Sequence, residues 1–166
     1  CRRQRQMCIR DSLKSEEKMF RLLQGDVGSG KTIVALISCL NVVNSGYQVA
    51  FMAPTEILAY QHYKLAQSLI KDKMKIGFLT SKTDYSERKK IINDLETNKL
   101  NILFGTHSVF QEKINYKKLG LVVIDEQHKF GVKQRKKLSD KGGKNCDVLV
   151  MSACLLYTSD AADDIT

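Results

Sequence analysis

The stretch FRLLQGDVGSGKTIVALISCLNVVNSG, residues 20–46, joins a short apolar run, a glycine-rich turn and a long apolar segment. Residues 20–24 predict a β-strand, and residues 31–45 predict a buried helix because apolar side chains occur all around its turns. Gly46 then ends the helix, since glycine readily takes the left-handed conformation that follows many helices. A strand, a tight turn and a helix in direct succession indicate the first unit of an α/β fold.

The turn itself, GDVGSGKT at residues 25–32, matches the phosphate-binding pattern G-x-x-x-x-G-K-[ST] in the required strand–helix context. Its glycines let the backbone curve around an anion, and the helix that follows adds the positive end of its dipole. Lys31 can reach the β- and γ-phosphates of a nucleotide, and Thr32 can offer its hydroxyl to Mg²⁺. The predicted nucleotide site consists of Gly25, Asp26, Val27, Gly28, Ser29, Gly30, Lys31 and Thr32.

Strands and helices continue to alternate along the chain. Further strands are predicted at residues 48–53, 75–80, 101–105, 119–125 and 146–152, with helices at 54–70 and 85–97. The inward side chains of these helices are expected to be Ile57, Leu58, Leu65 and Leu69 in the first, and Ile91, Ile92 and Leu95 in the second. Apolar strands that alternate with helices predict a doubly wound α/β domain with a parallel sheet, the fold of a P-loop NTPase.

Two carboxylates end the most apolar strand, in LVVIDEQHKF at residues 121–130. Burial of an unpaired carboxylate is strongly unfavourable, so Asp125 and Glu126 should find partners beyond the sheet. A parallel sheet gathers its ligands at the carboxyl ends of its strands, which would bring Asp125 opposite Thr32 as a second Mg²⁺ ligand. Glu126 would then orient and deprotonate an attacking water. The alternative is that both acids only cap the following helix.

Composition narrows the class of protein. The longest apolar runs are far shorter than the ~18 residues of a membrane span, and the start of the chain has no secretory pattern, which favours a cytoplasmic protein. The net charge of +9 suits a nucleic-acid partner, although a lysine-rich solvated surface has the same composition. The cysteines form no C-x-x-C and no cluster with histidine, so no metal site of that kind is expected.

Four segments together resemble the first motor lobe of the RecG family of ATP-dependent DNA helicases in superfamily 2: LLQGDVGSGKT, APTEILAYQH, GTHSVFQ and DEQHKFGVKQR. The resemblance spans residues 13–153 and implies a RecA-like lobe that uses ATP and Mg²⁺. It also implies action on branched DNA in replication-fork repair and recombination. The transcription-repair coupling factors are similar too, but they usually carry DEEQRFGV where this chain has DEQHKFGV.

The resemblance assigns roles to individual positions. Lys31, Asp125 and Glu126 keep the duties given above, and Gln127 and His128 relay between nucleotide and DNA. The DNA-backbone contacts would come from Pro54, Thr55, Glu56, Gly105, Thr106 and His107. Ordinary helix capping is the alternative explanation for both segments, residues 54–56 and residues 105–107. On its residues alone His128 could be a surface histidine, and the basic stretch at residues 130–138 could be a DNA-facing rim or a solvated helix face.

The two ends differ from the body of the chain. Residues 1–12 carry arginine but no lysine, residues 154–166 are acidic, and neither end has a counterpart in the family. We expect a non-native or disordered head at 1–12 and tail at 154–166 around a lobe at 13–153 that is incomplete at its C-terminal end. The family's wedge domain and second lobe, with its arginine fingers, would be absent. This fragment should then be a monomer that binds nucleotide weakly, hydrolyses it barely and unwinds nothing.

Two other classes of protein remain open at this point. A small-molecule P-loop kinase or other NTPase would need a lid and an acceptor pocket, and would leave the DEQH and GTH segments unexplained. Crosslinking to single-stranded DNA that is lost on substitution of Thr55 or Thr106 separates it from a helicase. A non-catalytic binding module would bind nucleotide normally, and Glu126→Gln would not change its residual hydrolysis.

Overall fold

The computed structural model of the chain describes residues 20–26, 28–70, 73–125 and 146–153. Its elements, in chain order, are β1 (Phe20–Gly25), α2 (Lys31–Asn44), β2 (Gln48–Met52), α3 (Glu56–Ile70), β3 (Ile76–Leu79), α4 (Tyr85–Glu96), β4 (Ile102–Gly105), the 3₁₀ helix η1 (His107–Phe110), β5 (Leu119–Asp125) and β6 (Asp147–Ala153). Every predicted strand and helix is present, with ends that differ by at most two residues. The predicted head and tail lie outside the described residues.

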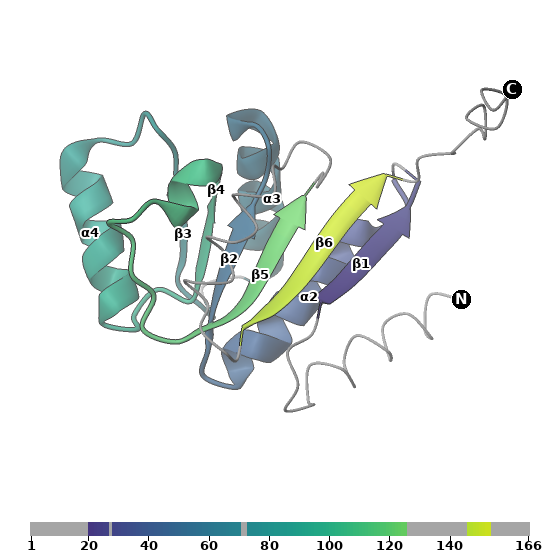
Figure 1. Cartoon of the computed structure of the whole chain (residues 1–166), viewed down its shortest axis with the longest axis horizontal. Helices are drawn as coiled ribbons and strands as arrows, with labels where there is room; N and C mark the ends of the chain where they lie inside the picture. The colour runs from purple at the N-terminus through teal and green to yellow at the C-terminus, as the bar shows by residue number, and fades with distance from the viewer. Residues whose placement is uncertain (1–19, 27, 71–72, 126–145, 154–166) are drawn as a thin grey trace, which may run out of the picture.

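The strands form one six-stranded sheet in the order β1-β6-β5-β2-β4-β3 (Figure 1). Every neighbouring pair is parallel. β2, β4 and β5 are buried along their whole length, as expected of apolar strands that are covered on both faces. The predicted doubly wound α/β fold with a parallel sheet is therefore confirmed.

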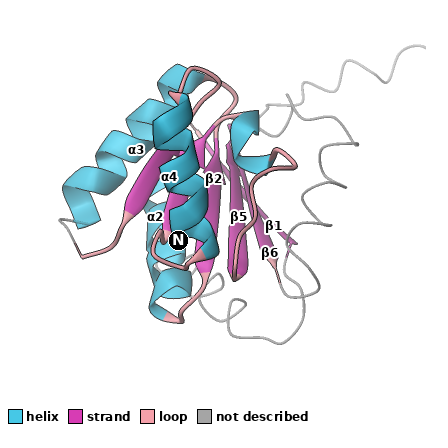
Figure 2. Cartoon of the chain, turned by 90° about the vertical axis from the view of Figure 1, so that its left-hand side faces the viewer, coloured by secondary structure: helices cyan, strands magenta, loops and turns pink. Residues whose placement is uncertain are grey.

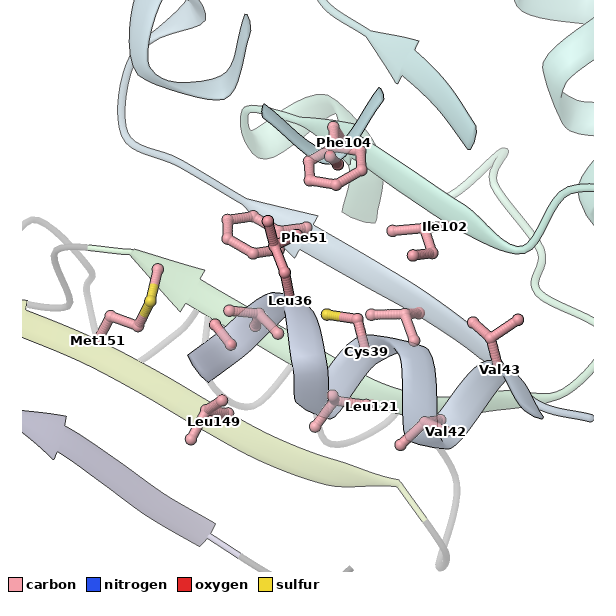
Figure 3. Close-up of a cluster of buried hydrophobic side chains, with 14 of the residues drawn as sticks. Leu36, Cys39, Val42, Val43, Phe51, Ile102, Phe104, Leu121, Leu149 and Met151 are labelled. Carbon is pink, nitrogen blue, oxygen red and sulfur yellow. The ribbon is translucent and has the colours of Figure 1, made fainter. Parts of the chain in front are cut away.

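Helices cover both faces of the sheet (Figure 2). On one face α2 and α3 meet the strands, and Leu36 and Cys39 of α2 lie against the side of the sheet that carries Phe51 and Phe104 (Figure 3). On the other face α4 and η1 cover a second apolar cluster, in which Leu95 is fully buried. The two clusters leave the strand ends as the place where polar side chains gather.

The inner face of α3 differs from the prediction. Ile57 and Leu69 were expected to point inward, but they are 72% and 53% exposed, and Leu58 and Leu65 are only half-buried. The buried side chains of α3 are Ala59, His62, Ala66 and Ile70, which follow each other at spacings of three and four. Small alanines let the helix approach the sheet closely, so shape outweighs hydrophobicity in choosing the face.

Because all six strands run the same way, their carboxyl ends meet at one edge of the sheet. Asp125, the last residue of β5, is level with Met151 of β6, which in turn is level with Leu23 of β1. Met52 of β2 is level with Gly105, the last residue of β4. The edge thus has two halves, one formed by the ends of β1, β6 and β5 and the other by the ends of β2, β4 and β3.

Candidate functional site

The loop after β1 is a tight turn whose shape depends on glycine. Gly28 and Gly30 have φ angles of 80° and 82°, in the left-handed region that residues with a side chain rarely adopt. Gly30 is also the N-cap of α2, and the Ser29 amide donates to the Asp26 carbonyl at 3.0 Å. Val27, which was predicted as part of the nucleotide site, lies outside the described residues. Turns that contain left-handed residues can present backbone amides to an anion.

Lys31 begins α2 and reaches back across the loop. Its ammonium donates hydrogen bonds to the carbonyl oxygens of Gly25 and Asp26, the second at 2.9 Å. Both acceptors are neutral, and within the described ranges Lys31 forms no ion pair with a carboxylate. Its charge is therefore available to an anion in the loop, where the N-terminus of α2 adds favourable amide dipoles. Thr32 follows in the first turn and is half-buried.

Asp125 ends β5 as a buried carboxylate that is 8% exposed. Its Oδ2 accepts a hydrogen bond of 2.7 Å from Nε2 of His62 in α3. Because an ionised carboxylate can only accept, Nε2 of His62 carries the hydrogen. Among the residues that the structure describes, Oδ1 of Asp125 receives no hydrogen bond.

The donors at this edge suit magnesium better than zinc. No cluster of three or more His, Cys, Asp or Glu side chains that could hold a metal occurs among the described residues. Mg²⁺ usually takes one or two protein oxygens and completes its shell with water and phosphate oxygens. The hydroxyl of Thr32 and a carboxylate oxygen of Asp125 are ligands of that type, supplied by two segments that reach the same edge of the sheet.

Sequence reasoning did not identify His62 as a site residue. Its ring is 8% exposed and lies beside Phe51 of β2, with ring centroids 5.0 Å apart. The signal in the sequence is the position of this histidine between Ala59 and Ala66 at helical spacing, on a stripe that small residues mark as the inner face. A histidine on such a stripe has to find a polar partner inside the protein, and Asp125 is that partner.

The other half of the edge begins with Pro54, Thr55 and Glu56, between β2 and the first turn of α3. Thr55 caps this helix, because its Oγ1 accepts a hydrogen bond of 3.3 Å from the Leu58 amide, which is what the alternative of ordinary helix capping expected. Glu56 is paired with the loop after β3, where it accepts from the Ser81 hydroxyl at 3.1 Å and lies 3.2 Å from Nζ of Lys82. That pairing offsets the negative charge of Glu56.

Gly105, Thr106 and His107 lie at the end of β4, next to the end of β2. The Ala53 amide donates to the Gly105 carbonyl at 3.0 Å, which ties the two segments together. A Cβ atom at Gly105 would lie 2.1 Å from the carbonyl oxygen of Leu79, so only glycine fits at this position. Thr106 is the N-cap residue of η1, and His107 is exposed. The structure thus brings both predicted DNA-contact segments to adjacent strand ends.

Three predicted site residues, Glu126, Gln127 and His128, lie outside the described residues, as does the basic stretch at 130–138. The helices of the described ranges include none that is both long and apolar enough to cross a bilayer.

Named proteins resemble this chain closely over most of its length. It is 50% identical over 146 residues to the ATP-dependent DNA helicase RecG of Thermotoga maritima, and 50% identical over 147 residues to that of Aquifex aeolicus. Each alignment covers 87% of this chain but only 19% of the relative, so the chain spans about a fifth of their length. A solved structure of RecG bound to a three-way DNA junction matches with a TM-score of 0.80 and 42% identity, over 90% of this chain and 20% of that one.

The sequence profile of the DEAD/DEAH box helicases matches residues 3–161. Members of that family use nucleotides, in keeping with the loop geometry at Gly28 and Gly30. The profile match, which takes in almost all of the 166 residues, together with the parallel sheet, shows that this chain belongs to the DEAD/DEAH box helicase family.

Proposed function

We propose that this chain is the first motor lobe of a RecG-type ATP-dependent DNA helicase. The observation that carries the proposal is that the glycine loop with Lys31 and the buried carboxylate of Asp125 reach the same edge of the sheet. The chain is also 50% identical over 146 residues to a RecG protein. The borders at residues 13 and 153 belong to the same proposal.

In this proposal the loop at residues 25–32 holds the phosphates of ATP. Its amides and the Lys31 ammonium bind the β- and γ-phosphates, while Thr32 and Asp125 hold Mg²⁺. The cation, when bound, neutralises the charge that develops on the phosphates. Lys31 is suited to phosphate binding because its ammonium is hydrogen-bonded to neutral carbonyl oxygens. Breaking these hydrogen bonds costs less free energy than breaking an ion pair with a carboxylate.

The residues after Asp125 complete the proposed chemistry. Glu126 orients the attacking water and takes its proton, which is the general-base step of ATP hydrolysis. Gln127 and His128 pass the state of the nucleotide to the DNA contacts. These three assignments rest on the DEQH sequence and on family membership.

One DNA strand is proposed to run along the half of the edge formed by β2, β4 and β3. The proposed contacts are Pro54, Thr55, Glu56, Gly105, Thr106 and His107. Amides at the start of α3 favour a phosphate, and Lys82 offsets the charge of Glu56 beside them. Branched DNA is the proposed substrate of the intact parent, in replication-fork repair and recombination, because the related RecG structure holds a three-way junction.

We expect this chain to be a poor ATPase by itself. Its relatives are about five times longer, and a second lobe and a wedge domain are proposed for the parent. In the described ranges the arginines are Arg21 in β1 and Arg88 in α4, and neither belongs to the loop after β1. An arginine that stabilises transferred phosphate can contribute roughly 10³–10⁵ in rate. A cytoplasmic monomer is proposed.

Binding of a fluorescent ATP analogue with and without Mg²⁺ tests the nucleotide site. Lys31→Ala should weaken binding roughly ten- to a hundred-fold, since a hydrogen bond to a charged group contributes about 1.5–3 kcal/mol. Lys89→Ala removes an exposed lysine from α4 and serves as the control. Equal affinity of the two variants would refute the assignment of the loop.

Anisotropy of a labelled three-way DNA junction tests the second half of the edge. Binding should weaken steeply with salt, because phosphate contacts release counterions. At any one salt concentration, Thr106→Val should weaken binding of the DNA junction. Thr97→Val, at the C-terminal end of α4, should leave this binding unchanged. Loss of DNA binding in both variants, or in neither, would contradict the proposed strand path.

A further inference from the structure

His62 and Asp125 form a hydrogen-bonded pair that is kept away from solvent. Both residues are 8% exposed, and Nε2 of His62 lies 2.7 Å from Oδ2 of Asp125. By contrast, the ion pair between Lys82 and Glu56 lies at the surface, with the lysine side chain 82% exposed.

The surroundings of His62 are apolar. Phe51 lies against its ring, and Ala59 and Ala66 flank it on the inner face of α3. Removing a polar pair from water is costly, and an apolar side chain of similar volume often gives equal or greater stability at such a position. Stability of the fold therefore does not require a histidine at position 62. The histidine is better explained by its hydrogen bond to Asp125.

We propose that His62 is a positioning residue for the Mg²⁺ ligand Asp125, an inference that rests on the proposed function. Its hydrogen bond fixes Oδ2, so the carboxylate cannot rotate, and Oδ1 remains for the cation. A carboxylate with one oxygen held by a buried donor is preorganised, as are metal ligands that a second shell of hydrogen bonds orients. Without the donor, Asp125 would sample several orientations and bind the cation more weakly.

The position of His62 in α3 gives the hydrogen bond its precision. Ala66 and Ile70 anchor the following turns on the sheet, and the ring contact with Phe51 restricts the imidazole from the side. Asp125 is equally fixed, because β5 is buried along its length between β2 and β6. Both partners are thus held by rigid elements, which is the arrangement that ligand positioning requires.

The test is the Mg²⁺ dependence of nucleotide binding, measured by anisotropy of a fluorescent ATP analogue in a Mg²⁺ titration and in EDTA. His62→Leu keeps the volume but cannot donate, so half-maximal tightening should need at least fivefold more Mg²⁺ while affinity in EDTA stays within twofold. His62→Gln should recover most of the effect, because its amide can donate from a similar position. Ile91→Ala is the control, since it removes a buried side chain from α4 in the cluster on the other face of the sheet.

The outcomes separate this inference from the proposed function. Wild-type Mg²⁺ dependence in a folded His62→Leu variant would overturn the role of His62 and leave the nucleotide site intact. Absence of Mg²⁺-dependent binding in the unaltered chain would overturn the proposed function and this inference with it. Should His62→Leu not fold, the imidazole ¹⁵N resonances of the unaltered chain decide the matter. Mg²⁺ added to the nucleotide complex should shift those of His62 and not those of His107, and unchanged His62 resonances would refute the role.

Discussion

Gln48 offers a sharp test of how the sheet is held together. It is fully buried at the start of β2, where its side chain joins three segments that are far apart in sequence. Its Nε2 donates to the carbonyl oxygens of Leu95 and Leu100, each at 2.9 Å, and its Oε1 accepts from the Lys118 amide at 3.1 Å. We predict that Gln48→Leu, which has a similar volume but no polar atoms, strongly destabilises the fold.

The magnitude follows from what each partner loses. The Leu100 carbonyl is left buried without this donor, at a cost of roughly 1–3 kcal/mol, while the Leu95 carbonyl keeps a bond from the Asn98 amide. The two remaining hydrogen bonds contribute about 0.5–1.5 kcal/mol each, and burial of the leucine side chain returns about 1 kcal/mol. The expected loss in the free energy of unfolding is therefore about 1–5 kcal/mol, centred near 3 kcal/mol.

Urea unfolding followed by circular dichroism measures this loss. Gln67→Leu makes the same chemical change at an exposed position of α3 and should stay within about 0.5 kcal/mol of the unaltered chain. A Gln48→Leu variant that unfolds within about 1 kcal/mol of that control would refute the reasoning, because it would mean that the buried amide is not needed to join these segments.

Three further perturbations follow from the same structure. Gly105→Ala should lower unfolding free energy by about 2–3 kcal/mol in urea titrations, because its Cβ would overlap the Leu79 carbonyl; a change under about 0.5 kcal/mol would contradict that contact. Thr55→Val should cost about 1 kcal/mol through loss of the cap on the Leu58 amide, whereas Thr55→Ser should not, and equal unfolding midpoints for the two would count against the cap. Burial raises the pKa of the Cys39 thiol far above its ordinary value, so its alkylation in the folded chain should stay negligible between about pH 7 and pH 9 and become rapid in urea; mass spectrometry of the labelled peptide that showed a rate rising with pH would oppose this.

Local patterns in the sequence were enough for the sheet and the glycine loop. Continuous apolar strands and a glycine turn between strand and helix are signals within a few residues, and the structure places β1, the loop and α2 as expected. The predicted inner face of α3 was wrong because the large apolar residues of this helix lie on a different face from its alanines. Hydrophobicity favoured Ile57 and Leu69, whereas close approach to the sheet requires Ala59 and Ala66.

The buried polar residues could not be inferred from the sequence for a different reason. His62 lies 63 positions before Asp125 in the chain, and Gln48 joins carbonyls 47 and 52 positions away. The spacing of Ala59 and Ala66 marks His62 as inward-facing but does not identify its partner, and nothing near Gln48 distinguishes it from a surface polar side chain. Only the strand order brings these partners together, and strand order in a parallel sheet does not follow from the order of the chain.

The two halves of the strand edge are joined by a short and rigid route. α3 begins beside Thr55 in the half proposed for DNA, and two turns later, about 10 Å along the helix, His62 contacts Asp125 in the half proposed for the nucleotide. A DNA strand that displaces the start of α3 must also displace His62, because a helix transmits displacement along its axis. If DNA tightens Mg²⁺–nucleotide binding through this contact, thermodynamic linkage requires Mg²⁺–nucleotide to tighten DNA binding by the same factor. Absence of any tightening would refute the coupling, and tightening that survives His62→Leu would place it in another part of the chain.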